Sequence, residues 1–259
     1  MSDLRRDSDV RARMTTTTPD SKIASLSMPR HDVDFVSRLL AVPDVSSAVA
    51  DALDELGVGF VLDSTALRPI TPGIRLCGQA VTLRYISLDG DVSSNRHAGR
   101  GRIFGDRDLY GLGRPGDVAV MDCSGSLTGA VMGALSARWA IKAGIAGCVV
   151  DGAVRDTDSI RASGLPVFGA TTNPAAARYR YDIAEMNGPV TVQGCTVLPG
   201  DYVVADGDGI CIIPFAEMPR VVAHCEAAYR TEVAFIDRID SAPSLEELVA
   251  GLTPGTAPA

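Results

Sequence analysis

The sequence has 259 residues, of which 46% are hydrophobic and 22% are charged, and its formal net charge is −8. These values are typical of a folded globular protein and exclude a fibrous or largely disordered chain. An acidic chain lacks the attraction for phosphate that dominates nucleic-acid binding, so we expect no nucleic-acid partner.

No segment predicts a membrane span or a secretory signal. No stretch reaches the roughly 20 apolar residues that a transmembrane helix requires, and residues 1–28 are polar and Thr-rich without an apolar run. The six cysteines form no CxxC pair, and four of them lie in or beside apolar runs, as small buried residues do: Cys77, Cys148, Cys195 and Cys211. We therefore expect a cytoplasmic protein with no membrane partner and with a disordered tail over residues 1–28.

The first half of the chain predicts two helices, a long strand and a long polar loop. Residues 31–42 and 46–57 have helical patterns, and the second helix has Ser46 or Ser47 as its predicted N-cap. Residues 75–88 have the β-branched and apolar content of a strand. Residues 89–114 are rich in Gly and Arg, and a loop of this length in a compact domain is usually functional or mobile.

From residue 115 onward, strands and helices alternate as they do in an α/β layer. Strands are predicted over 115–122, 146–152 and 165–169, and helices over 133–144 and 156–164, each helix closed by a glycine. Short strands separated by turns follow over residues 188–214, and residues 216–239 repeat apolar residues with helical period. We expect one domain over residues 29–240 and a C-terminal tail over 241–259.

The stretch CVVDGAVRDTDSI places Arg155 and Asp156 just beyond a buried strand, with a turn predicted at Gly152. One hypothesis is that both charges lie on the surface and that Asp156 caps the helix that follows. The other is that a carboxylate suited to a divalent cation and a guanidinium suited to an anion stand together at the mouth of a site.

Small residues begin the preceding helix, so the N–H groups of Gly133–Ser136 are suited to an anionic group. A helix N-terminus, an arginine and a metal held by a carboxylate together suit a 2-oxo acid. The metal would chelate its carboxylate and keto oxygens, and the arginine would stabilise the enolate formed when a C–C bond breaks.

The stretch GALSARWAIKAGIAGCVVDGAVRDTDSIRASGLPVFG, with SSAVADALDELG, GQAVTL and PGDYVVADGDGICIIP, resembles the RraA-like family over residues 45–240. This family includes the class II 4-hydroxy-4-methyl-2-oxoglutarate/4-carboxy-4-hydroxy-2-oxoadipate aldolases and the regulators of ribonuclease activity. The resemblance implies a single-domain α/β fold, a swivelling α/β/β sandwich. It also implies a homo-oligomer, a trimer or hexamer, in which the C-terminal helix packs on a neighbouring subunit.

By resemblance to the aldolases, Asp156 would bind Mg²⁺ or Mn²⁺, and Arg155 would contact pyruvate. Glu232 of the C-terminal helix would act in the site of a neighbouring subunit. The pyruvate carboxylate would be held by the backbone amides of four residues that begin a helix: Gly133, Ala134, Leu135 and Ser136. The implied activity is a metal-dependent lyase reaction on a small-molecule 2-oxo acid, a retro-aldol cleavage that releases pyruvate. Decarboxylation of oxaloacetate would use the same enolate.

One position departs from the aldolase pattern. The aldolases carry an Asp twenty-one residues before the Arg, oriented toward the water shell of the metal, where this chain has Ala134. Asp106 or Asp108 could supply a substitute. Two alternatives therefore stay open: a non-catalytic protein that regulates a partner enzyme, as the ribonuclease regulators do, or another metal–enolate reaction on a different substrate. The retention of Asp156 favours metal binding over pure regulation.

Overall fold

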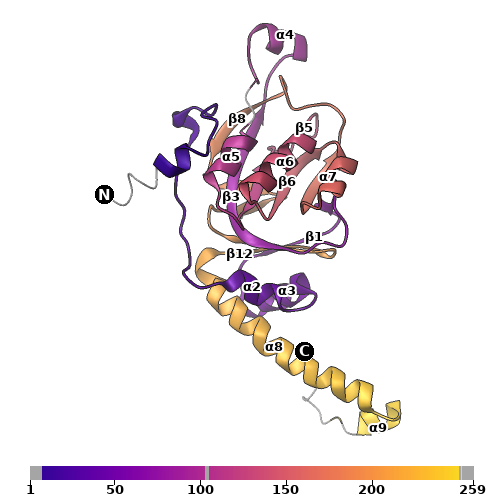
Figure 1. Ribbon diagram of the computed structural model, residues 1–259. Coiled ribbons are helices and arrows are strands. Elements are labelled where there is room, and N and C mark those ends of the chain that lie inside the picture. The colour runs from indigo at the N-terminus through magenta and orange to yellow at the C-terminus, as the bar shows by residue number, and fades with distance from the viewer. Residues whose placement is uncertain (1–7, 103–104, 251, 253–259) are drawn as a thin grey trace.

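The computed structural model describes residues 8–102, 105–250 and 252. These residues form a curled ten-stranded sheet with the order β1-β12-β11-β3-β4-β6-β7-β2, in which β5 pairs with β6 and β8 pairs with β3 (Figure 1). Strands β3, β4, β6 and β7 are parallel, whereas β1, β12, β11 and β3 are antiparallel. The long strand β3 takes part in both halves and joins them.

The parallel half contains the alternating strands and helices that the sequence predicts. Its described elements are β3 (Leu76–Ser87), α5 (Asp106–Leu112), β4 (Val118–Asp122), β5 (Ala130–Met132), α6 (Ala134–Ala143), β6 (Gly147–Val154), α7 (Thr157–Ser163) and β7 (Val167–Thr172). Both α6 and α7 end at glycines in the left-handed conformation, Gly144 and Gly164, as predicted. The prediction of a turn at Gly152 is wrong, because β6 continues to Val154. A side chain at Gly152 would clash with Sγ of Cys123, which explains the glycine.

The antiparallel half consists of short strands covered by helices. This half contains β1 (Phe60–Asp63), β11 (Tyr202–Ala205) and β12 (Gly209–Ile213). Strands β2 (Arg68–Pro69) and β8 (Tyr181–Met186) pair with β7 and β3, and β9 (Val190–Val192) and β10 (Cys195–Val197) form a separate two-stranded sheet. The remaining described helices are η1 (Asp20–Lys22), α2 (Phe35–Leu40), α3 (Val45–Leu56), α4 (Val92–His97), η2 (Phe215–Glu217), α8 (Met218–Ser241) and α9 (Leu245–Ala250). Helices α2, α3 and α8 lie below β1 and β12 in Figure 1.

The alternation of side chains along the strands divides the core into layers. Ile210 and Ile212 of β12 pack with Val118 and Val149 in the space between the two halves of the sheet. Cys211, between them, packs against α2, α3 and α8 on the other face. A third cluster lies between the parallel strands and helices α5, α6 and α7. The predicted α/β/β sandwich in a single domain is therefore confirmed.

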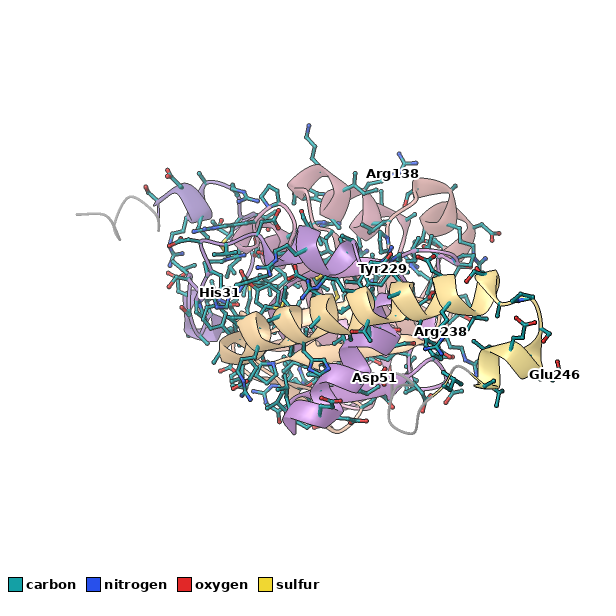
Figure 2. All side chains as sticks on the ribbon, turned by 90° about the horizontal axis from the view of Figure 1, so that it is seen from below. His31, Asp51, Arg138, Tyr229, Arg238 and Glu246 are labelled. Atoms are coloured by element: carbon teal, nitrogen blue, oxygen red, sulfur yellow. The ribbon has the colours of Figure 1, made fainter. Side chains whose placement is uncertain are left out.

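Helix α8 is half buried and half exposed along its length. Met218, Val221, Val222 and Cys225 are buried, whereas farther along the helix three apolar side chains are 39–45% exposed: Val233, Ile236 and Ile239. Figure 2 shows α8 crossing the underside of the molecule, and Figure 1 shows its later turns extending below the rest of the domain toward α9. The first turns of α8 therefore belong to the core of this chain, while its later turns project from it.

The disordered tail predicted for residues 1–28 is wrong for residues 8–28, which lie against the domain; residues 1–7 lie outside the described residues. The carboxylate of Asp108 accepts backbone N–H groups from Thr15 at 2.5 Å, Thr16 at 3.1 Å and Thr18 at 2.7 Å. The N–H of Ala24 donates to the carbonyl of Met186 at 2.9 Å. The segment is thus held by hydrogen bonds to distant residues and by apolar side chains that pack against the core, among them Val10, Met14 and Ile23.

We expect Asp108→Asn to release this N-terminal segment. Burial raises the pKa of Asp108, but hydrogen bonds from Thr15 and Thr18 outweigh it and leave the pKa below its ordinary value of 3.8. The lowered pKa means that this stabilisation is fully present above pH 3.8 and is lost as the pH falls through the folded pKa. The substitution should reduce the free energy of unfolding by about 2 kcal/mol. Limited trypsin digestion should then cut at Lys22 faster than in the unmodified protein, and an unchanged cleavage rate would contradict the prediction.

Two further predictions for the first half of the chain are corrected. Residues 89–114 do not form one long loop, because α4 and α5 lie within them, and the side chain of Asp91 accepts the N–H of Ser94 at the start of α4. The N-cap of α3 is Asp44 rather than Ser46 or Ser47. The backbone N–H and hydroxyl of Ser46 instead donate to Asp206, in the turn between β11 and β12.

The end of the chain differs from the predicted tail in one respect. Helix α9 lies within residues 241–259, while residues 251 and 253–259 lie outside the described part. Among the helices that the structure describes, none combines the length and the apolar character needed to cross a membrane. The cytoplasmic location stays a prediction.

Candidate active site

The end of strand β6 and the start of helix α6 meet at one edge of the parallel sheet. Helix α6 begins at Ala134 after Gly133, and the backbone N–H of Arg155 donates to the carbonyl of Met132 at 2.9 Å. The first hydrogen bond within the helix runs from the N–H of Ala137 to the carbonyl of Gly133. The N–H groups of the three residues before Ala137 therefore have no acceptor within the helix and point from its N-terminus.

The carboxylate of Asp156 lies at this helix terminus. Its Oδ2 atom accepts the N–H of Ala134 at 3.1 Å and lies 3.7 Å from Nε of Arg155. The Asp156 and Arg155 side chains are 45% and 41% exposed. An ion pair with this exposure contributes about 1 kcal/mol or less to stability, so stability does not account for the arrangement.

The structure agrees with the capping hypothesis in the position of Asp156 but not in the contacts of its side chain. Asp156 occupies the N-cap position of α7, but its side chain makes no capping hydrogen bond there. Instead it turns back to α6, and its backbone adopts the left-handed conformation with φ of 55°. Left-handed backbone in a residue other than glycine is uncommon and is found at functional sites more often than elsewhere.

Gly133 allows the Arg155 and Asp156 side chains to approach α6. A Cβ atom on Gly133 would lie 2.7 Å from Oδ2 of Asp156 and 3.1 Å from Cγ of Arg155. The φ of Gly133 is −154°, which any residue can adopt, so close approach rather than backbone conformation requires the glycine.

We expect Gly133→Ala to displace both side chains without unfolding the protein. A shift of about 1 Å in a site commonly costs on the order of a hundredfold in activity. Gly207→Ala is a suitable control, because a Cβ atom there meets nothing within 4 Å. Mn²⁺ affinity, measured calorimetrically, should fall in the first variant and stay unchanged in the control. Equal affinities in both variants would contradict the prediction.

Arg155 and Asp156 line a cavity of about 160 Å³. Its wall also includes Gly133, Leu135 and Ser136 of the predicted carboxylate-binding segment, together with Asp106, Arg107 and Arg178. Three guanidinium groups and two carboxyl groups therefore border one space, which favours an anionic ligand. The structure thus brings together the predicted metal, arginine and helix-terminus residues, but their functions stay predictions.

Asp106, and not Asp108, reaches this cavity. Asp106 is 3% exposed, and its Oδ1 atom has no hydrogen-bond partner among the described residues. Burial raises the pKa of Asp106, although a hydrogen bond from Ser136 and the charge of Arg107 oppose the rise. The sequence offers both aspartates as substitutes for the missing carboxylate at position 134, and the structure places only Asp106 at the cavity.

Arg107 and Arg178 were not predicted as site residues. The guanidinium of Arg107 lies 5.6 Å from the ring centroid of Trp139, on α6. Arg178 belongs to the segment before β8 and has no sequence motif around it. For Arg107, the only signal in the sequence was the polar character of residues 89–114. For Arg178 the sequence gave no signal.

Glu232 is exposed on the later part of α8, beyond the buried turns of that helix, and is not among the residues that line the cavity. Its predicted role requires a second copy of the chain. No cysteine is among the residues that line the cavity, and burial raises the pKa of Cys77, Cys148 and Cys211 to about 12. The expectation that these three cysteines are buried is confirmed, while Cys195 is only partly buried.

This sheet and cavity define an α/β protein with an anion-attracting site at the carboxyl end of a parallel strand. Within this class, the family model described as RraA-like, Aldolase/RraA, matches residues 46–212. The chain belongs to the RraA-like family.

Three similar proteins illustrate the range of this family. A protein of Halalkalibacterium halodurans, provisionally named as a 4-hydroxy-4-methyl-2-oxoglutarate aldolase, is 31% identical over 75% of this chain and 83% of its own length. A 4-hydroxy-4-methyl-2-oxoglutarate aldolase of Thermus thermophilus is 36% identical over 53% of this chain and 85% of its own. The crystal structure of Streptomyces coelicolor RraAS2, described as an unusual member of the RNase ES inhibitor RraA family, superposes with a TM-score of 0.65. It is 28% identical and covers 82% of this chain and 99% of its own.

Proposed function

We propose that this protein is a divalent-metal-dependent lyase that cleaves a 2-oxo acid by a retro-aldol reaction and releases pyruvate. The observation that carries the proposal is the meeting of Arg155, Asp156 and the N-terminus of α6 at one cavity. The aldolase names of its relatives support the reaction class. Decarboxylation of oxaloacetate through the same enolate is part of the proposal.

The donor groups at the cavity fit Mg²⁺ or Mn²⁺. Asp156 presents a half-exposed carboxylate, and no group of three or more His, Cys, Asp or Glu side chains within the described part of the chain could enclose a metal. Mg²⁺ commonly binds to one or two carboxylates and keeps several waters, so it needs no such enclosure. When bound, the metal would polarise the keto oxygen and stabilise negative charge on it.

The remaining groups would orient the substrate and stabilise its charge. The carboxylate of the 2-oxo acid would accept N–H groups at the start of α6, from the segment Gly133–Ser136. The guanidinium of Arg155 would donate to the keto oxygen, where negative charge collects when the C–C bond breaks. This position favours the enolate over the uncharged ketone, which is how the site would lower the barrier.

We propose that a second copy of the chain completes the site in a trimer or hexamer. The later turns of α8 carry exposed Val233, Ile236 and Ile239, whose burial against another subunit would be favourable. Glu232 lies on the same part of the helix and would enter the neighbouring site with it. Light scattering of the purified protein tests the assembly directly, and a monomer would contradict it.

The function is tested by adding 4-hydroxy-4-methyl-2-oxoglutarate or oxaloacetate to the purified protein with Mg²⁺ or Mn²⁺. Pyruvate should form, and chelation of the metal should stop its release. If neither substrate yields pyruvate with either metal, the lyase assignment is wrong.

A non-catalytic regulator of the ribonuclease-inhibitor type is the second candidate. Two observations favour it: the structural similarity to RraAS2, and Ala134 in place of a carboxylate beside Asp156. Calorimetric titration with Mg²⁺ and oxalate, a planar analogue of the pyruvate enolate, separates the two candidates. Heat from oxalate that depends on the metal would favour the lyase, and no binding would favour the regulator.

A further inference from the structure

One carboxyl group at the cavity is almost fully buried although one of its two oxygens has no hydrogen-bond partner among the described residues. Asp106 begins α5, is 3% exposed, and leaves Oδ1 without a hydrogen-bond partner among the described residues. Burying a polar atom without a partner costs free energy that a fold normally avoids. An unpaired carboxyl oxygen beside a cavity therefore indicates a group kept for a ligand.

Asp108 of the same helical turn shows what a structural carboxylate looks like in this protein. Both of its oxygens accept hydrogen bonds, from the backbone and side chains of the segment Thr15–Thr18. Asp108 thus anchors the N-terminal segment. Oδ1 of Asp106 has no such donor among the described residues, and Asp106 lines the cavity that Arg155 and Asp156 also line.

Burial among the groups around Asp106 raises the pKa of its carboxyl group and so favours the protonated form. The hydroxyls of Tyr85 and Tyr110 and the thiol of Cys148 lie close enough to interact with it, and burial raises the pKa of each of these three groups. They are therefore neutral near pH 7 and provide no cation to bind a carboxylate. The hydrogen bond from Ser136 and the charge of Arg107 only partly offset the effect of burial on the pKa of Asp106.

We propose that Asp106 is the acid that protonates the enolate and so completes the release of pyruvate. This inference rests on the proposed lyase function. Asp106 borders the cavity from α5, whereas Arg155 and Asp156 border it from the end of β6. The acid and the groups that stabilise the enolate oxygen therefore come from different elements around one space.

The protons balance in the proposed sequence. The substrate hydroxyl loses its proton to solvent, the bond between C3 and C4 breaks, and its electron pair forms the C2–C3 enolate. The enolate then re-forms the C2 carbonyl, and C3 takes the proton from the carboxyl group of Asp106. The resulting carboxylate regains a proton from solvent, so no net proton is gained or lost.

The test isolates the proton-transfer step by following deuterium exchange. Pyruvate is incubated with protein and Mg²⁺ in D₂O, and loss of its methyl protons is followed by NMR. Asp106→Asn should slow this exchange about a hundredfold, because general acid catalysis typically contributes that much or more. Its affinity for oxalate should stay within about threefold, since oxalate binding requires no proton transfer. Removal of a methyl proton from pyruvate requires the carboxylate form of Asp106, so exchange by the unmodified protein should fall at low pH, and this fall should be absent from the variant.

The control is Asp158→Asn on α7, where a fully exposed carboxylate pairs with Arg161 on the surface. This variant should exchange at the unmodified rate. If Asp106→Asn does not fold, Asp106→Ala with added formate provides a second measurement, in which formate should restore exchange. If the unmodified protein releases pyruvate, two results would overturn the role of Asp106 alone. One is undiminished exchange in Asp106→Asn, and the other is the absence of rescue of Asp106→Ala by formate. Neither release nor exchange by the unmodified protein would overturn both this role and the proposed function.

Discussion

Arg155→Ala should lower the rate of pyruvate release by about 10²- to 10³-fold, the usual effect of removing one donor to a developing oxyanion. The guanidinium is 41% exposed and makes no buried ion pair, so the loss should not come from unfolding. Arg155→Lys keeps the charge but not the planar pair of donors and should recover only part of the activity.

The matched control for this prediction is Arg138→Ala. Arg138 lies on the exposed face of α6, and Figure 2 shows its side chain directed away from the molecule. Steady-state assays of pyruvate release should give the unmodified rate for Arg138→Ala. Equal rates for the Arg155 and Arg138 variants would remove Arg155 from the proposed mechanism.

Asp156→Asn should remove metal binding and reduce metal-dependent activity by about a thousandfold or more, because a neutral amide is a far weaker ligand for a hard divalent cation. Asn tolerates the left-handed conformation that Asp156 adopts, with φ of 55°, better than other residues do. The Asp156 side chain makes no capping hydrogen bond to α7, and the amide oxygen of Asn can still accept the N–H of Ala134, so the melting temperature should change little.

Two measurements on the same sample check this second prediction. Calorimetric titration with Mn²⁺ should show binding to the unmodified protein and to Asp158→Asn, but not to Asp156→Asn. Thermal unfolding without metal should give similar midpoints for all three proteins. Undiminished Mn²⁺ affinity in Asp156→Asn would place the metal elsewhere.

The sequence predicted elements whose signals are local. Strands β3, β4 and β6 are apolar runs bounded by turns, and α6 and α7 each end at a glycine, so their positions follow from short stretches. Strands β5 and β8 were not predicted, and neither were β1 and β2. Strand β5 has only three residues. Strand β8 pairs with the end of β3 and mixes polar and apolar residues, so it does not form an apolar run.

The site was predictable where its residues are neighbours in sequence. Arg155 and Asp156 both directly follow strand β6, and the strand order brings the start of α6 beside them. The choice between Asp106 and Asp108 was not predictable, because it depends on the direction of each side chain from a single helical turn. Asp108 turns to Thr15, 93 residues earlier in the chain, and no local pattern encodes that contact.

Helix α5 carries both aspartates and is held from two sides. Tyr110 of this helix meets Ser136 of α6 at 2.8 Å, while Gly111 lies so close to the N-terminal segment that a Cβ atom would clash with the carbonyl oxygen of Arg13. The family match begins only at residue 46. A shortened chain covering residues 46–212 would keep every residue of the cavity and yet lose one of the two supports of Asp106. The smallest active unit of this protein is therefore expected to start well before residue 46, where the family match begins.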